Sequence, residues 1–351
     1  MRSNNKSATM TRLLLALSLL LAPCASLLAA DSGLSGTLLV ANRTGGSVSL
    51  YDLQTETEVT RLPIGERVPH ELTASPDGRW AVTSEYGGGS NPGQHLIVID
   101  IAAAEIMRRI DLGPGTRPHS IVFLDDSRHV ITTMERAEQI ALVDIIDGEI
   151  VRTFATGGND SHMVRLSPDN RHAFVAARGS GTLSKITLDG NELTSVIATG
   201  ARAEGIAVSP DGERVWVANQ DASTITAVDA DAMEIVGVIG SIATNRVEFL
   251  PNGIAVIPGG SNDGADVRHI TYFNGSTLAE VGHLELPGSS AFGTGVRLLA
   301  ANNALFLADS ALNEISAVVP AFVGERRVIA INPDNVDGMA WSPVRIISVR
   351  D

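Results

Sequence analysis

A short motif recurs along this chain at intervals of roughly 40 to 50 residues. The clearest copies occupy residues 71–78, 162–170 and 205–212 and read ELTASPDG, HMVRLSPDN and GIAVSPDG. Weaker copies begin at Ser120, Arg246, Gly295 and Gly338, which makes seven in all. Self-similarity at this period is typical of repeat proteins in which each repeat is one supersecondary unit.

Each copy is followed by three more short apolar runs, for example residues 215–219, 224–229 and 234–239. Four strands per repeat are typical of a propeller blade. The Pro-Asp-Gly set between the first two strands favours a tight turn, because proline presets φ and glycine accepts a positive φ. We therefore predict an all-β chain that folds as a seven-bladed β-propeller, with four antiparallel strands in each blade.

The two ends of the repeat region are expected to share one blade. Residues 36–65 supply only three strands, at 37–41, 47–52 and 58–63, and they lack an opening strand with the repeated turn. Residues 338–343 supply that missing strand. Joining them closes the ring and removes an exposed sheet edge that would template aggregation. The apolar tail 344–349 is left unassigned.

The Ser-Pro-Asp-Gly turns, the run VWVAN at 215–219 and the downstream Val-Asp together resemble the YVTN-type β-propeller repeat family. The resemblance covers residues 36–343 and implies the propeller fold. It leaves function open, because such propellers include surface and periplasmic binding proteins, lactonase-like enzymes and partners of redox enzymes. The copies at Arg246 and Gly295 lack the turn, so the boundaries of their blades stay undetermined.

Residues 1–30 have the order of a secretory signal peptide. Arg2, Lys6 and Arg12 precede an apolar run at 13–21, and small residues lead to Ala30. That run is far shorter than the roughly 20 residues of a membrane-spanning helix, so we predict no membrane span. We expect cleavage after Ala30, with residues 31–351 forming a single propeller domain in the periplasm or the medium.

Cys24 is the only cysteine. The segment before it faintly resembles a lipoprotein acceptor site, but Pro23 argues against lipidation, and both outcomes stay open. Cleavage after Ala30 would leave no thiol, so the core would have to hold the fold without disulfides.

The charge balance argues against a nucleic-acid partner. The full chain carries a net charge of −14, and residues 1–30 hold three cations and no anions. The remainder therefore stands at about −17, and such a surface repels phosphate backbones.

One polar residue per repeat lies two positions before the first apolar residue of the innermost strand. Around the ring these residues are His70, His119, His162, Glu204, Asn245, Thr294 and Asp337. Because the innermost strands run along the central channel, we expect these side chains to gather at one mouth. The three histidines come from consecutive blades, and neutral imidazoles suit zinc, copper, iron and nickel. We therefore predict His70, His119 and His162 as ligands of one divalent transition metal.

The loops between second and third strands should open on the same face. They and the ring position contribute candidate catalytic groups, namely Glu85, Glu135, Glu204 and Arg178. A carboxylate there could act as a general base toward a metal-bound water. Candidate ligand-binding residues at the same mouth are Arg67, Arg117, Arg202, Asn245, Arg246 and Asp337. Guanidinium groups in this position favour an anionic ligand.

A purely structural role is the alternative for the histidines. The pairs Pro69-His70 and Pro118-His119 fall where the resembled family often has Pro-His, so these rings could instead bond loop carbonyls. Two functions follow. The first is a binding or scaffold protein whose channel mouth holds a small anion or a loop of a periplasmic partner. The second is a metal-dependent lyase, hydrolase or oxidase built on the three histidines.

Overall fold

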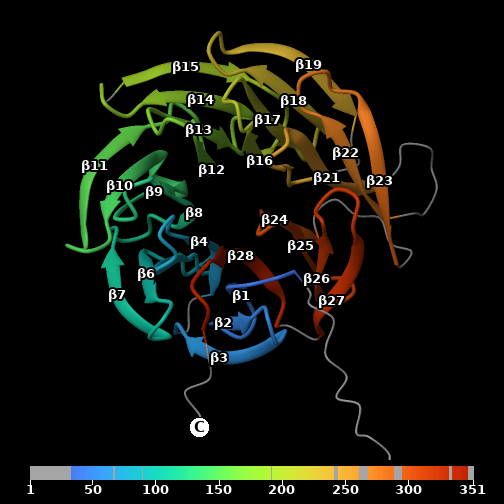
Figure 1. Cartoon of the computed structure of the whole chain (residues 1–351). Helices are drawn as coiled ribbons and strands as arrows, with labels where there is room; N and C mark the ends of the chain where they lie inside the picture. Colours follow the sequence, from blue (N-terminus) through green and yellow to red (C-terminus); the bar gives the residue numbers. More distant parts are fainter. Residues whose placement is uncertain are drawn as a thin grey trace, which may run out of the picture. The chain divides into compact units, whose positions relative to one another are not determined.

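The computed structural model of the chain describes one compact unit within Gly33–Asp351. The described residues are 33–65, 68–88, 90–190, 192–240, 244–260, 268–287, 295–331 and 334–346. They form seven four-stranded antiparallel sheets arranged in a ring (Figure 1). The prediction of a seven-bladed β-propeller is therefore confirmed. The predicted signal peptide, Cys24, Arg67 and Thr294 lie outside the described residues.

The strands of each blade follow one another outward from the centre. The innermost strands are β28 (Val336–Ser342), β4 (Pro69–Ala74), β8 (Pro118–Phe123), β12 (Ser161–Leu166), β16 (Ala203–Val208), β20 (Glu248–Phe249) and β24 (Val296–Ala301). The second strands are β1 (Thr37–Asn42), β5 (Trp80–Glu85), β9 (His129–Met134), β13 (His172–Ala177), β17 (Arg214–Asn219), β21 (Ile254–Gly260) and β25 (Ala304–Asp309).

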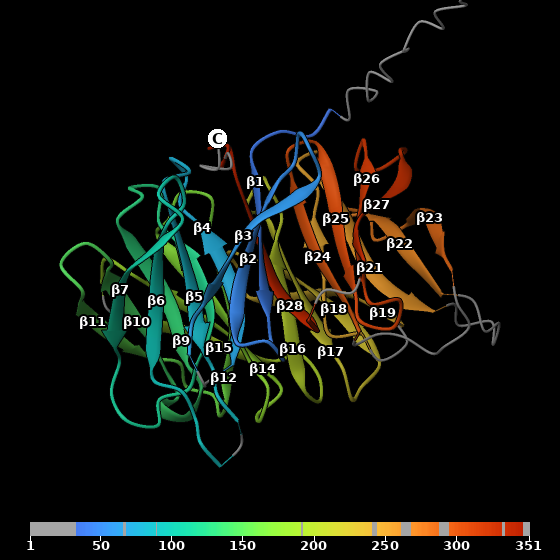
Figure 2. The same cartoon turned by 90° about the horizontal axis from the view of Figure 1, so that it is seen from below.

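The outer half of each blade is built in the same order. The third strands are β2 (Ser47–Asp52), β6 (His95–Asp100), β10 (Gln139–Asp144), β14 (Thr182–Thr187), β18 (Thr224–Asp229), β22 (Arg268–Asn274) and β26 (Glu314–Val319). The outermost strands are β3 (Thr57–Pro63), β7 (Glu105–Asp111), β11 (Glu149–Ala155), β15 (Glu192–Ala198), β19 (Glu234–Gly240), β23 (Glu280–Leu286) and β27 (Glu325–Ile331). Figure 2 shows the ring from the side.

The two ends of the described unit meet in one blade, as predicted. β28 pairs antiparallel with β1, with Ala340 opposite Leu39, and the sheet order is β28-β1-β2-β3. Past the strand, Arg345 donates to Asp52 on β2 at 2.8 Å. This pairing leaves no blade of the ring with a missing innermost strand.

The core lies between neighbouring blades. β17 alternates little because both of its faces are covered, and five of its six residues are buried. Trp216 on β17 is fully buried and packs edge-on against Phe249 of the next blade, with ring centroids 5.7 Å apart. The outermost β19 alternates between exposed and half-buried residues, as expected where one face meets water.

The two blades that lack the repeated turn are the irregular ones. β20 is only two residues long, and β24 connects to β25 through Asn302 and Asn303, both with positive φ. In the part of the chain that the structure describes, the helical element is one 3-10 turn, η1 (Glu135–Ala137). No helix among the described residues is long and apolar enough to cross a membrane.

Candidate functional site

A cavity of about 270 Å³ opens where the innermost strands begin. It is lined by Arg43, His70, Tyr86, Arg117, His119, His162, Arg178, Arg202, Glu204, Asn245, Arg246 and Arg297. Residues from innermost strands and from loops after second strands therefore meet at one mouth. We call this cavity the channel mouth.

Backbone irregularities place the polar residues there. In β4 the register with β5 shifts between Pro69 and Leu72, and in β8 the same shift falls between Pro118 and Ile121. Equivalent shifts bracket His162 in β12 and Glu204 in β16. A β-bulge re-aims the side chain at the irregular residue. The bulge thus turns the predicted ring positions into the channel in four consecutive blades.

The three histidines form a column of mutually tilted rings. The ring centroids of His70 and His119 are 4.3 Å apart, and those of His119 and His162 are 3.7 Å apart. Tyr86 meets both His70 and His119 edge-on, at 4.5 and 5.1 Å. All three histidines are buried. All three rings also line the cavity.

His162 is held between two carboxylates. Its Nδ1 lies 3.0 Å from Glu135 Oε1, and its Nε2 lies 2.7 Å from Glu204 Oε2. Burial opposes a charge on the ring, but the two carboxylates outweigh it and raise the pKa of His162. The imidazolium in turn lowers the pKa of Glu135 and Glu204 against the effect of their own burial. Both ring nitrogens of His162 are thereby occupied by protein groups.

His119 is the opposite case. Its ring is fully buried, and neither nitrogen has a hydrogen-bond partner among the described residues. Burial, followed by the charges of His162 and His70, holds the pKa of His119 well below its usual range. A neutral ring with one donor and one acceptor unsatisfied carries a free-energy penalty of about 1–3 kcal/mol for each group. His119 thus lines the cavity with both ring nitrogens unsatisfied by the described residues.

Arginines dominate the wall. Six of the twelve lining residues are arginines, whereas Glu204 is the one carboxylate among them. Arg178 is fixed by Glu135 at 2.9 Å and by Asp160 at 2.8 Å. The guanidinium of Arg117 lies over the Tyr86 ring, 4.0 Å from its centroid. Each of the six arginines pairs with a carboxylate, and apart from Glu204 those carboxylates do not line the cavity.

A layer of ion pairs forms the floor of the channel mouth. Arg246 donates to Glu71 at 2.8 Å, and Arg297 pairs with Asp337 at 2.7 Å. His70 Nε2 is 3.3 Å from the same Asp337. Although burial opposes it, Arg246 and His70 lower the pKa of Glu71, so both acids of the layer are charged. We call Arg246, Glu71, Arg297 and Asp337, with the ion pairs between them, the charged layer.

Several residues of the sequence prediction are found elsewhere. Glu85 pairs with His95 Nδ1 at 2.6 Å and lies 3.7 Å from Arg109, and it does not line the channel mouth. Asp337 belongs to the charged layer, where it pairs with Arg297, and does not line the channel mouth. Sequence reasoning missed Glu71, Arg297 and Arg43. Glu71 lies immediately after the ring position His70, where a regular strand would have turned it away, and Arg297 lies three residues after Thr294.

One cluster has the spacing of a metal site. Ligand atoms of His70, Glu71 and His119 lie within 4.8 Å of one another. This set differs from the predicted triplet, because His162 has both nitrogens engaged by Glu135 and Glu204. The structure therefore brings two of the three predicted ligands together and adds a carboxylate.

The chain has recognisable likenesses to other proteins. Residues 125–253 match the profile of the family described as Cytochrome D1 heme domain. The fold is similar to that of a functionally unknown protein from Desulfotomaculum acetoxidans, with a TM-score of 0.70 and 14% identity over 88% of this chain and 100% of that one.

A second structural likeness is to Hydrazine Synthase from Kuenenia stuttgartiensis. The TM-score is 0.63 and the identity 16%, over 78% of this chain and 90% of that one. No curated protein matches the sequence. At these identities the structural likenesses establish the fold alone, and it is that of a β-propeller.

Proposed function

We propose that this protein binds a small anionic ligand at the channel mouth, in the periplasm or outside the cell, without transforming it. The observation that carries the proposal is the excess of arginines over carboxylates on the wall of that cavity. The chain as a whole is acidic, so a cationic cavity is the feature that its overall charge does not explain.

The arginines are suited to this role by geometry and exposure. The side chains of Arg43 and Arg202 are 42% and 43% exposed. Arg43 pairs with Asp337 at 3.4 Å and Arg202 with Glu204 at 2.8 Å, and each guanidinium has further donors for a ligand. A guanidinium presents paired donors that match a carboxylate or phosphate. His119 at the base offers one donor and one acceptor to the same ligand. A loop of a periplasmic protein ending in an acidic side chain would satisfy the same groups.

Calorimetric titration of the full chain with citrate, oxalate, phosphate and neutral glucose tests this proposal. We expect at least one of the three anions to bind and glucose not to bind. Arg202→Gln should lower the affinity for the anion roughly tenfold, as for loss of a charge-assisted hydrogen bond. Arg79→Gln is the matched control, because Arg79 is 63% exposed and does not line the cavity. Anion binding that is equal in both variants would contradict the proposal.

A haem does not fit the channel mouth. The partial match to a haem domain raises that cofactor, and a histidine without partners could serve as an axial ligand. However, the cavity encloses about 270 Å³, below the roughly 300–1,000 Å³ of pockets for drug-sized ligands, and a tetrapyrrole is larger than most of these. The wall is charged, with Tyr86 as its aromatic member, and lacks the apolar faces that a macrocycle needs.

A metal centre is the second candidate function, favoured by the cluster of His70, Glu71 and His119. Two imidazoles and a carboxylate are a donor set that suits zinc and other divalent transition metals. A metal there would supply Lewis-acid chemistry to a lyase, hydrolase or oxidase. Arg246 already engages Glu71 at 2.8 Å, so the cation would have to displace that guanidinium.

Metal content separates the two functions. We expect purified protein dialysed against Zn²⁺ or Co²⁺ to retain about one equivalent only if the cluster is a metal site. His119→Ala should then lose it, while His283→Ala, on an exposed outer strand, should keep it. Stoichiometric metal in the His119→Ala protein would exclude this cluster as the site.

A further inference from the structure

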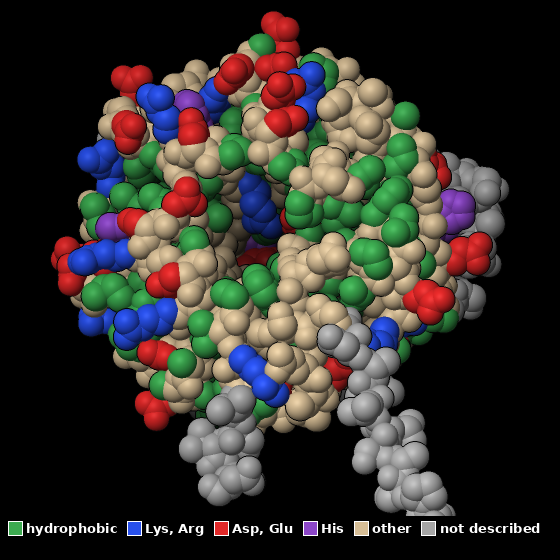
Figure 3. All heavy atoms as spheres, in the orientation of Figure 1, with side chains coloured by type: hydrophobic (Ala, Val, Ile, Leu, Met, Phe, Trp, Pro, Cys, Tyr) green, Lys and Arg blue, Asp and Glu red, His purple; other side chains and the backbone are tan. Residues whose placement is uncertain are grey.

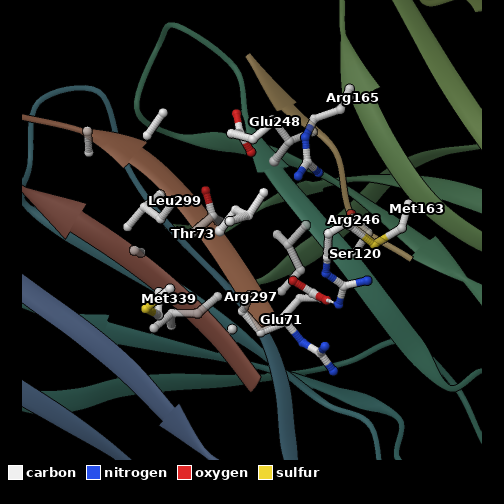
Figure 4. Close-up of a pocket in the computed structure, with 18 of the residues that line it drawn as sticks. Glu71, Thr73, Ser120, Met163, Arg165, Arg246, Glu248, Arg297, Leu299 and Met339 are labelled. Atoms are coloured by element: carbon white, nitrogen blue, oxygen red, sulfur yellow. Dashed lines mark hydrogen bonds and ion pairs between the residues drawn. The ribbon is translucent and has the colours of Figure 1, made fainter. Parts of the chain in front are cut away.

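A second cavity occupies the channel on the other side of the charged layer. Its volume is about 330 Å³, and Glu71, Arg246, Arg297 and Asp337 contribute to its lining as well as to the layer (Figure 4). In the space-filling view the centre of the ring is hollowed, with charged side chains inside and hydrophobic ones around it (Figure 3). We call this space the inner cavity. It is distinct from the channel mouth, where the anion is proposed to bind.

Apolar side chains form part of the walls of the inner cavity, beside polar and charged ones. Met163 of β12, Leu299 of β24 and Met339 of β28 border it from three different blades (Figure 4). Ile206 of β16 and Trp341 of β28 also contribute to its lining. Methionine side chains adapt to irregular ligand shapes because they are unbranched and polarizable. A cavity of this size, with both polar and apolar groups in its lining, suits a small organic molecule that carries both kinds of group.

The charged groups of the inner cavity fall into two kinds. Those of the charged layer already pair with one another, Arg246 with Glu71 and Arg297 with Asp337. Arg165 of β12 and Glu248 of β20 lie at the other end of the cavity (Figure 4).

Among the described residues no ion pair involves either Arg165 or Glu248. Arg165 Nη1 donates to the backbone oxygen of Val164 at 2.9 Å, which leaves its other donors for a ligand. Burial raises the pKa of Glu248, and the charge of Arg165 offsets only part of that effect. Arg165 and Glu248 thus share one end of the cavity and their charges interact, but among the described residues no direct ion pair joins them.

We propose that the inner cavity binds a zwitterionic small molecule with an apolar side chain, of which an apolar α-amino acid is the simplest. Its carboxylate would pair with Arg165, its ammonium group with Glu248, and its side chain would pack on Met163, Leu299 and Met339.

Ligands with a single charge fit the inner cavity less well. A simple carboxylate would pair with Arg165 and leave the half-buried carboxyl of Glu248 without a cation from the ligand. A simple amine would leave Arg165 without an anion. Because an unpaired buried charge is unfavourable, the pair of residues selects for both charges on one ligand.

Titration calorimetry of the full chain with L-leucine and L-methionine tests the proposal. We expect at least one of them to bind. N-acetyl-leucine lacks the ammonium group and leucinamide lacks the carboxylate, and each should bind roughly tenfold more weakly or not at all. Glu248→Gln and Arg165→Gln should each lower the affinity for the amino acid by a similar factor. Arg79→Gln, remote from the cavity, should leave it unchanged.

Failure here can be told apart from failure of the anion proposal. Arg202→Gln alters the channel mouth and not the lining of the inner cavity, so its affinity for leucine should equal that of the wild type. The inference is overturned if neither amino acid binds. It is also overturned if leucine and N-acetyl-leucine bind with equal affinity. A third contrary outcome is that Arg202→Gln no longer binds leucine while Glu248→Gln and Arg165→Gln bind it as the wild type does.

Discussion

The rings of His119 and His162 stack with their centroids 3.7 Å apart, although their pKa values move in opposite directions. Both rings are buried, so burial alone does not separate them. The difference is that His162 touches two carboxylates while His119 touches other rings. A charged and a neutral imidazole thus stack in the same column, and the neutral one is left for a ligand.

The first prediction concerns pH. The folded pKa of His162 lies above its ordinary value of 6.5, so its stabilising effect is complete below pH 6.5 and is lost as pH rises through the folded pKa. The pKa values of Glu135 and Glu204 are lowered from 4.5, so their contribution is complete above pH 4.5 and is lost on acidification. The free energy of unfolding in urea should therefore be highest between pH 4.5 and 6.5. In His162→Gln, the decrease of this free energy above pH 6.5 should be smaller.

The second prediction contrasts two substitutions by phenylalanine. His119→Phe removes two unsatisfied polar atoms while keeping a flat ring, so the free energy of unfolding should stay equal or rise by about 1–3 kcal/mol. His162→Phe removes the buried imidazolium from between Glu135 and Glu204, which keep Arg178 and Arg202 as cationic partners, and should cost at most about 3–5 kcal/mol. Chemical denaturation at pH 6 measures both. The reverse order would show that His119 has a structural partner.

The third prediction concerns ring closure. Deleting residues 337–351 removes nearly all of β28 and the contact of Arg345 with Asp52, so β1 becomes an open edge. We expect loss of cooperative thermal unfolding, measured by circular dichroism, and increased aggregation, measured by light scattering. A chain ending at Ile346 keeps the described closing contacts and serves as the control. An unchanged melting temperature in the longer deletion would count against closure by this strand.

The fourth prediction tests the tight approach of two innermost strands. A Cβ added at Gly338 on β28 would lie 2.6 Å from the backbone oxygen of His70 and 2.6 Å from the backbone nitrogen of Leu72 on β4. Backbone atoms cannot rotate away, so Gly338→Ala should destabilise the protein by about 1–3 kcal/mol. Gly282→Ala on β23 is the control, since a Cβ there meets nothing within 4 Å. Denaturant midpoints of the two variants should differ clearly.

The blade architecture could be predicted from the sequence because its determinants are local. The Ser-Pro-Asp turn at residues 75–77 specifies a hairpin from within: Ser75 Oγ bonds Asp77 and accepts from the Trp80 backbone. Repetition of that unit then implies a ring. The predicted closing strand also followed from counting strands, since residues 36–65 supply three where each repeat has four.

The candidate site was predictable only in part. The ring positions His70, His119 and His162 emerged because each repeat places the same strand position at the same height in the channel. The role of each histidine did not. Which carboxylate each histidine contacts depends on how neighbouring blades are placed. Glu85, predicted at the same mouth, pairs with His95 instead.

The amino-acid sequence by itself determined the number of blades, their strands and the polar residue at the start of each innermost strand, since turn chemistry and a period of two act within a few residues. Only the tertiary structure decided that Arg246 meets Glu71, 175 residues apart, and that the resulting charged layer divides the channel into two cavities. The physical reason is that ion pairing in the channel depends on bulges and on the curvature of the closed ring, which bring distant side chains within a few ångströms.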